Sequence, residues 1–115
     1  HDMTLDDLRE YGANVEEGLS RCMNKEDFYL RLVGVLPTDN HFDMLYEALE
    51  TKDLDTAFDA AHAVKGSATN LAMTPLSAPL SEITELLRSR TDTDYSELIA
   101  TIKDAQQRLI AIINS

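Results

Sequence analysis

The chain has 115 residues, 43% of them hydrophobic, which is enough for one domain with a single packed core. Its 21 acidic and 10 basic side chains give a net charge of −11 at pH 7. Nucleic acid and anionic membranes require a basic footprint, so this surface excludes both as partners. No apolar run approaches the ~20 residues needed for membrane insertion. The single cysteine, Cys22, cannot form an intrachain disulfide and is interpreted as a buried thiol, so a cytoplasmic location is expected.

Short helices are predicted at the N-terminus. We interpret residues 1–3 as a cloning remnant or disordered start, in which His1 has no role, and residues 4–115 as a single helical domain. Thr4 is a typical N-cap and Gly12 a typical helix end, and a second helix is expected over 15–23. Asn24 is expected to cap a third helix, which Pro37 ends. The apolar residues expected to line these helices are Val15, Leu19, Cys22 and Met23, then Phe28, Leu32 and Val35, joined by Tyr29, Val33 and Leu36.

Four longer amphipathic segments show apolar residues three or four positions apart. The first begins at Thr38 or Asp39, and the second begins near Leu54. The third is expected to have Thr74 as its N-cap, and Pro79 predicts a kink or a delayed start because it removes a backbone hydrogen bond. The last runs from about 95 to 113. The predicted core-facing residues are Phe42, Leu45, Tyr46 and Leu49; Leu54, Ala57, Ala61, Val64, Ala68 and Leu71; Leu76, Leu80, Ile83 and Leu87; and Leu98, Ile102, Ala105, Leu109 and Ile112.

These segments predict the fold class. No segment alternates with a period of two, so strands are not expected. The prediction is an all-α, antiparallel four-helix bundle with one or two additional short N-terminal helices that cover one end. A monomer is the expected state. His41 has no companion ligand at helical spacing and is interpreted as a surface residue.

The most informative stretch is residues 60–73, because it places a histidine on the outer side of a helix. Successive residues turn by about 100°, so the stripe from Leu54 to Leu71 faces the core and His62 lies about 140° away from it. The imidazole is therefore expected to point toward solvent. The neighbours of His62 one turn away are Phe58, Lys65, Gly66 and Thr69.

Gly66 and Lys65 indicate what the imidazole is for. A glycine inside a helix costs about 1 kcal/mol relative to alanine. Gly66 is expected to face outward, so close helix packing does not explain it, and access to His62 does. Lys65 adds a positive charge in an otherwise acidic chain. This combination favours transient attachment of an anionic group, of which a phosphoryl group fits best. The alternatives are a tolerated helix defect at Gly66 and an ordinary surface lysine at Lys65.

The pattern His62-x-x-Lys65-Gly66 resembles the HxxKGxxxxxG signature of histidine-containing phosphotransfer (HPt) domains, which carry phosphoryl groups in phosphorelays. The continuation through Ser67, Ala68, Asn70 and Leu71 is also similar. The second glycine of the signature falls at Ala72, which we interpret as a tolerable substitution because alanine is small and favours helix. In length and helix order the resemblance covers nearly the whole chain.

The resemblance implies a role for each residue of this stretch. His62 would accept the phosphoryl group, on Nε2, from a receiver-domain aspartate or a sensor kinase and pass it to another receiver. Lys65 and Gly66, with Thr69 and Asn70 as weaker candidates, would form the phosphoryl environment. Phe58 and Asp59 are candidate docking residues. Mg²⁺ is expected on the partner receiver, and no cofactor is expected on this chain.

Other interpretations of His62 stay open: an ordinary surface histidine, or a metal or haem ligand. A zinc site needs three or four ligands, and no His, Cys or Glu lies at a standard spacing from His62. The chain also has no glycine-rich nucleotide loop and no Walker motif, so no autonomous kinase activity is expected. The competing function is a non-catalytic acidic interaction module. That alternative explains a helical bundle but leaves an outward His-x-x-Lys-Gly unexplained.

Overall fold

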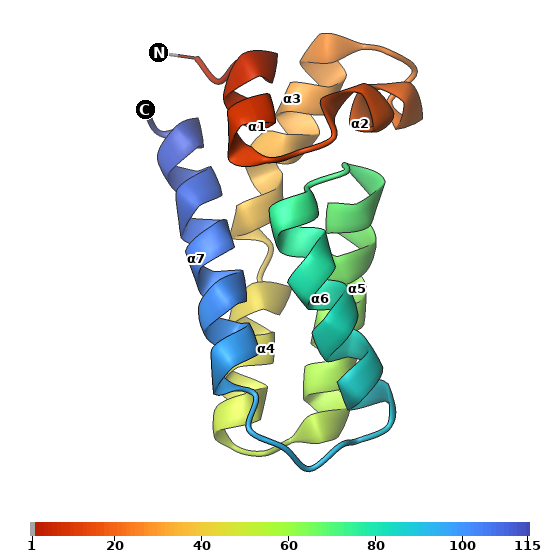
Figure 1. The fold of residues 1–115 in the computed structure, drawn as a ribbon, viewed down its shortest axis with the longest axis vertical. Helices are drawn as coiled ribbons and strands as arrows, with labels where there is room; N and C mark the ends of the chain where they lie inside the picture. Colours follow the sequence, from red (N-terminus) through yellow and green to blue (C-terminus); the bar gives the residue numbers. More distant parts are fainter. Residues whose placement is uncertain (1) are drawn as a thin grey trace.

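The computed structural model describes residues 2–115, and over that range it contains helices and no strand (Figure 1). His1 lies outside the described residues. Helices α4 to α7 pack together as a bundle, which confirms the predicted fold class, and α1, α2 and α3 lie at one end of it. No helix among residues 2–115 is long and apolar enough to cross a membrane. The elements are α1 (Leu5–Tyr11), α2 (Val15–Arg21), α3 (Glu26–Val35), the 3₁₀ turn η1 (Leu36–Thr38), α4 (His41–Glu50), α5 (Leu54–Asn70), α6 (Thr74–Arg88) and α7 (Ser96–Ile113).

The bundle core is built around a helix with unusually small core residues. On α5, Ala57, Ala61 and Ala68 are completely buried, so neighbouring helices can approach its backbone closely. Larger side chains from the other three helices fill the remaining space. The buried stripes predicted for α5 and α6 are confirmed, apart from half-buried Leu54. The larger completely buried residues on α4, α6 and α7 are Phe42, Leu45, Leu76, Leu80, Ile83, Leu87, Ile102 and Leu109.

Hydrogen bonds to backbone carbonyls join the N-terminal helices to the bundle. The Tyr29 hydroxyl donates to the Leu71 carbonyl at 3.0 Å, and the Tyr11 hydroxyl donates to the Ala105 carbonyl at 2.7 Å. Gly18 of α2 allows the first of these contacts. A Cβ at Gly18 would lie 2.5 Å from a ring carbon of Tyr29 and 2.7 Å from the Leu71 oxygen. The end of α5 is therefore covered by α2 and α3.

Left-handed residues other than glycine terminate several of the described helices. Met23, Lys52, Ala72 and Arg90 follow α2, α4, α5 and α6, with φ angles between 50° and 58°. In each case the next residue donates its N–H to a carbonyl five positions back, the pattern of a Schellman motif. This motif closes each helix within two residues and so permits the short turns of the bundle.

The structure places Ala72 differently from our interpretation of the sequence. We interpreted it as a helix-favouring substitution, but α5 ends at Asn70 and Ala72 lies beyond the helix, with a φ of 57°. A non-glycine residue in this conformation carries about 1–2 kcal/mol of strain. Two backbone bonds hold it there: its N–H donates to the Thr69 carbonyl at 3.0 Å, and its carbonyl accepts the Asn14 N–H at 3.0 Å.

Some of the N-terminal apolar pattern was assigned to the wrong face. Met23 is 67% exposed and Val35 is 58% exposed, while Phe28 and Leu32 are half-buried. Helix α2 ends at Arg21, so Met23 no longer follows its periodicity. On α3 both stripes are expected to be apolar; Phe28 and Leu32 of the first pack partly buried against the core, whereas Tyr29 and Val33 of the second are completely buried. The residues that reach the core are Tyr29, Val33 and Leu36.

Several predicted boundaries were wrong. Helix α6 has Met73 as its N-cap and Thr74 as its first residue, and it continues through Pro79 without a delayed start. The bond that Pro79 cannot make would go to the carbonyl of Pro75 in the first turn. Helix α4 begins only at His41, because the chain forms the 3₁₀ turn η1 after α3. Helix α3 is preceded by Lys25 as its N-cap, and not by Asn24.

Candidate functional site

Helix α5 carries the candidate site on its exposed face. The Asp53 carboxylate accepts the backbone N–H of Thr56 at 3.1 Å and so caps the first turn. Seventeen residues follow in one helix, with the alanine-rich stripe in the core and His62 on the opposite, exposed face. The outward orientation expected for His62 is therefore what the structure shows.

The imidazole of His62 has no hydrogen-bond partner among the described residues. Its closest aromatic neighbour is Phe58, one turn earlier, whose ring centroid lies 5.6 Å away at an angle of 47°. Both ring nitrogens are thus unoccupied by protein groups within residues 2–115. An exposed imidazole without a bond to either nitrogen is what a nucleophilic carrier requires.

Open space lies beside the ring. A Cβ placed on Gly66 would meet no atom within 4 Å, so this glycine does not serve helix packing. Lys65 is half-buried, and Thr69 and Asn70 are exposed. The Thr69 carbonyl accepts a hydrogen bond from the Arg21 guanidinium of α2. All five residues predicted for the phosphoryl site, from His62 to Asn70, lie on α5. Asn70 lines a groove together with Leu32 and Val35 of α3.

Two arginines and a glutamate missing from the sequence prediction lie next to this face. The guanidinium carbons of Arg88 and Arg90 are 5.1 Å and 4.9 Å from the centroid of the Phe58 ring. Arg88 donates to the Glu85 carboxylate at 2.8 Å, and Arg90 donates to the Asp55 carboxylate at 2.6 Å. Such cation–π contacts require α6 to be placed against α5, which helical periodicity alone does not specify. The one available signal was a pair of arginines at the end of a helix in an acidic chain.

These charges influence one another. The pKa of the Glu85 carboxyl is lowered mainly by its hydrogen bond to Arg88 and by the charge of Arg88, with smaller contributions from Lys65 and His62. The Glu85 carboxylate on α6 is therefore close enough to the α5 site for the charges of Lys65 and His62 to act on it. Asp59, one of the two expected docking residues, is exposed. Phe58, the other, is half-buried, and two guanidinium groups lie over its ring.

The other candidate residues of the sequence are accounted for structurally. Cys22 is buried, as predicted. His41 lies half-exposed at the start of α4, where its Nδ1 is 2.7 Å from an oxygen of Asp39. Within residues 2–115, no group of three or more His, Cys, Asp or Glu side chains is arranged to hold a metal ion.

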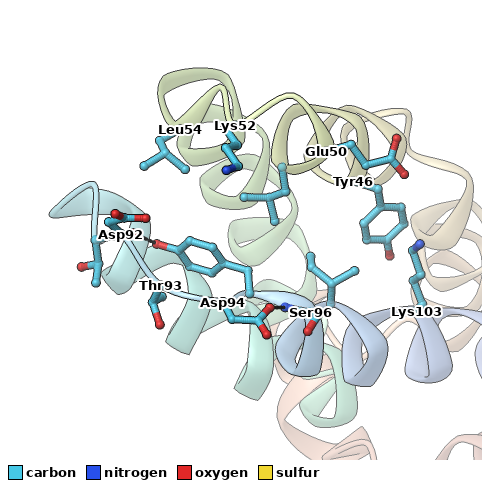
Figure 2. A pocket seen from close by; sticks show the side chains of 13 residues that line it. Tyr46, Glu50, Lys52, Leu54, Asp92, Thr93, Asp94, Ser96 and Lys103 are labelled. Atoms are coloured by element: carbon cyan, nitrogen blue, oxygen red, sulfur yellow. Dashed lines mark hydrogen bonds between the residues drawn. The ribbon is translucent and has the colours of Figure 1, made fainter.

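A pocket lies on another part of the surface, and Figure 2 shows the side chains that line it. It is formed by the C-terminal half of α4, the start of α5, the loop before α7 and the start of α7, and includes none of the residues predicted for the site. In it, the Lys103 ammonium lies 4.8 Å from the centroid of the Tyr46 ring. A smaller groove adjoins the last turn of α5 and is lined by Leu32, Val35, Leu36, Asp39, Ser67, Asn70 and Leu71.

Comparison with known proteins identifies one family. The model of the Hpt domain family matches residues 38–112, a span that begins in η1 and includes α4, α5, α6 and nearly all of α7. The match therefore includes the helix that carries His62 and the helix that carries Arg88. No curated protein matches the chain, and neither does any solved structure.

Proposed function

The chain belongs to the Hpt domain family, and on that premise we propose that His62 is the residue that carries the phosphoryl group in a phosphorelay. The observation that carries this proposal is the exposed imidazole, unbonded at both nitrogens, beside the open space over Gly66. We further propose that residues 4–115 act as a single monomeric domain in the cytoplasm.

The transfer step is a displacement at phosphorus. A ring nitrogen of His62, Nε2 by family resemblance, attacks the phosphorus of a phosphorylated aspartate on a receiver domain. The N–P bond forms as the P–O bond breaks, and the aspartate leaves as a carboxylate. The reverse step passes the group to a second receiver. An imidazole is largely neutral near pH 7, so its nitrogen lone pair is available for attack.

The surrounding residues support this step in different ways. Lys65 supplies a positive charge for the phosphoryl oxygens, and Gly66 leaves room for the partner's acidic pocket to reach the ring. Thr69 and Asn70 lie on the exposed side of the same helix and could contact the phosphoryl group or the partner. Phe58 and Asp59 are proposed docking contacts. Partners are receiver domains or a hybrid sensor kinase, and the catalytic Mg²⁺ belongs to the receiver.

Phosphoryl transfer from a panel of phosphorylated receiver domains tests this function. The wild type is compared with His62→Gln, which keeps a polar side chain but removes the nucleophile. Acid-labile label on the wild type and none on the variant is the expected result. Label that persists on His62→Gln would refute the site. Binding of receivers without transfer of label would favour the alternative, a non-catalytic interaction module.

A further inference from the structure

Two arginine clusters in the described chain have nearly the same internal geometry. Arg88 lies 5.1 Å from the centroid of Phe58 and 2.8 Å from the carboxylate of Glu85. In the second cluster, Arg108 lies 5.0 Å from the centroid of Tyr11 and 3.1 Å from the carboxylate of Asp104. The exposed fractions also match, at 51% for Arg88 and 50% for Arg108. The first cluster differs in that its aromatic ring packs against His62 and also lies under Arg90.

Arg88 also differs from Arg90, the other arginine on Phe58. Arg90 is held by several bonds: its guanidinium donates to Asp55 across the helix pair at 2.6 Å and to the carbonyl of Leu87 at 2.8 Å. Among residues 2–115, the Arg88 guanidinium has a single hydrogen bond, to Glu85 one turn earlier on its own helix. An exposed pair of this kind contributes little to stability, so it exchanges easily for another anion. Arg88 is therefore the more available of the two guanidinium groups over the Phe58 ring, against which His62 also packs.

We propose that Arg88 is a second anchor for the phosphoryl group on His62, and that Glu85 occupies this anchor while His62 is unmodified. This inference rests on the proposed function. The geometry that supports it is continuous: the His62 ring packs on Phe58, Arg88 lies over the same Phe58 ring, and Glu85 binds Arg88. Lys65 is then the first cation at the site and Arg88 the second.

Charge explains why the exchange would favour the phosphoryl group. A phosphoryl group carries about −1.5 to −2 charges at neutral pH, compared with −1 for a carboxylate. A guanidinium also binds the oxygens of a phosphoryl group in a planar fork. Arg88 keeps its protons and only changes its hydrogen-bond partner, so the exchange needs no co-reactant. Glu85 would act as a positioning residue that competes for the anchor and repels the phosphoryl group.

The experiment is a ³¹P NMR titration of protein loaded with phosphoramidate, which avoids any dependence on receiver docking. The ionisation of the phosphoryl group on His62 is followed from about pH 9 to about pH 5.5, around the usual second pKa near 6. The variants are Arg88→Gln, Arg88→Lys and Glu85→Gln. Their matched controls from the second cluster are Arg108→Gln and Asp104→Asn, and His62→Gln reports on the carrier itself.

A nearby guanidinium favours the doubly charged phosphoryl group and lowers its pKa. Arg88→Gln should therefore raise the ³¹P midpoint by roughly 0.2–0.7 pH unit, the value of one exposed charge pair. Arg88→Lys should restore part of this shift, and Glu85→Gln should lower the midpoint. The Arg108 and Asp104 controls should match the wild type.

The experiment distinguishes a wrong assignment of Arg88 as an anchor from a wrong assignment of His62 as the phosphoryl carrier. A wild-type midpoint in Arg88→Gln, or an equal shift in Arg108→Gln, would overturn the anchor while leaving the phosphorylated His62 in place. Wild-type protein that takes up no label from phosphoramidate or from any receiver would overturn the proposed function, and the anchor with it.

Discussion

Replacing Gly66 with alanine should stabilise the fold and at the same time slow phosphoryl transfer. Gly66 is a helical residue four positions before the end of α5, and an added Cβ would meet no atom within 4 Å. The methyl group therefore costs no packing strain. It does occupy the open space beside His62, through which we propose that the phosphorylated partner approaches.

The size of the gain follows from helix propensity. Alanine is favoured over glycine by about 0.8–1.0 kcal/mol in a helix interior, and no clash offsets this difference. An increase of about 1 kcal/mol in the free energy of unfolding corresponds to a rise in Tm of about 4 °C for a domain of this size. Gly34 in the last turn of α3 is the matched control, because a Cβ there also meets no atom within 4 Å.

Urea unfolding and phosphoryl transfer are measured on the same preparations. Gly66→Ala should unfold at higher urea and transfer more slowly, and Gly66→Glu should transfer more slowly still while remaining folded. Gly34→Ala should transfer like the wild type, with a smaller gain in stability because it lies at a helix end. Wild-type transfer rates in both Gly66 variants would refute the argument that this glycine provides access. A less stable Gly66→Ala would refute the argument that the space is open.

Three further predictions concern stability. Lys52→Gly should raise the free energy of unfolding in urea by about 0.5–1 kcal/mol, because relief of left-handed strain exceeds the entropy cost of glycine. Ala72→Gly should change it less, since that substitution also removes a buried methyl group worth about 0.8 kcal/mol. Gly18→Ala should lower the free energy of unfolding by about 1–3 kcal/mol, because the added Cβ would overlap Tyr29. An unchanged melting curve would contradict the close approach of Tyr29 to this helix. Burial raises the pKa of Tyr29 to about 12, compared with about 10 when unfolded, so its contribution to stability is complete below pH 10 and is lost as pH rises through 12. Tyr29→Phe should show a flatter decline in this range, and equal slopes for the two proteins would argue against this assignment.

Periodicity predicted the parts of the site that lie on one helix. His62 lies opposite the core stripe because both are fixed by the geometry of α5, and that stripe is apolar throughout. Gly66 and Lys65 follow from the same geometry. Arg88 and Glu85 could not be predicted in this way, because their position near His62 depends on how α6 packs against α5.

The errors have local causes. On α3, Val35 and Val33 both belong to stripes with helical spacing, and only tertiary packing shows that Val33 is the buried one. At Pro79, the helix tolerates a missing first-turn bond because Leu76, Leu80 and Ile83 are held in the core. Ala72 was placed inside the helix by extending the pattern past Asn70, where the chain instead turns to begin α6.

The hydrogen bonds from α1 and α3 to the bundle bear on how this domain could be transplanted between proteins. The family match begins at residue 38, yet the Leu71 and Ala105 carbonyls are bonded by tyrosines that precede it. A fragment trimmed to the matched span would leave the end of α5 uncovered and would lose the buried contacts of Tyr29. We therefore expect a fusion that keeps residues from Thr4 onward to be more stable than one trimmed to residue 38, because it retains the hydrogen bonds of Tyr11 and Tyr29.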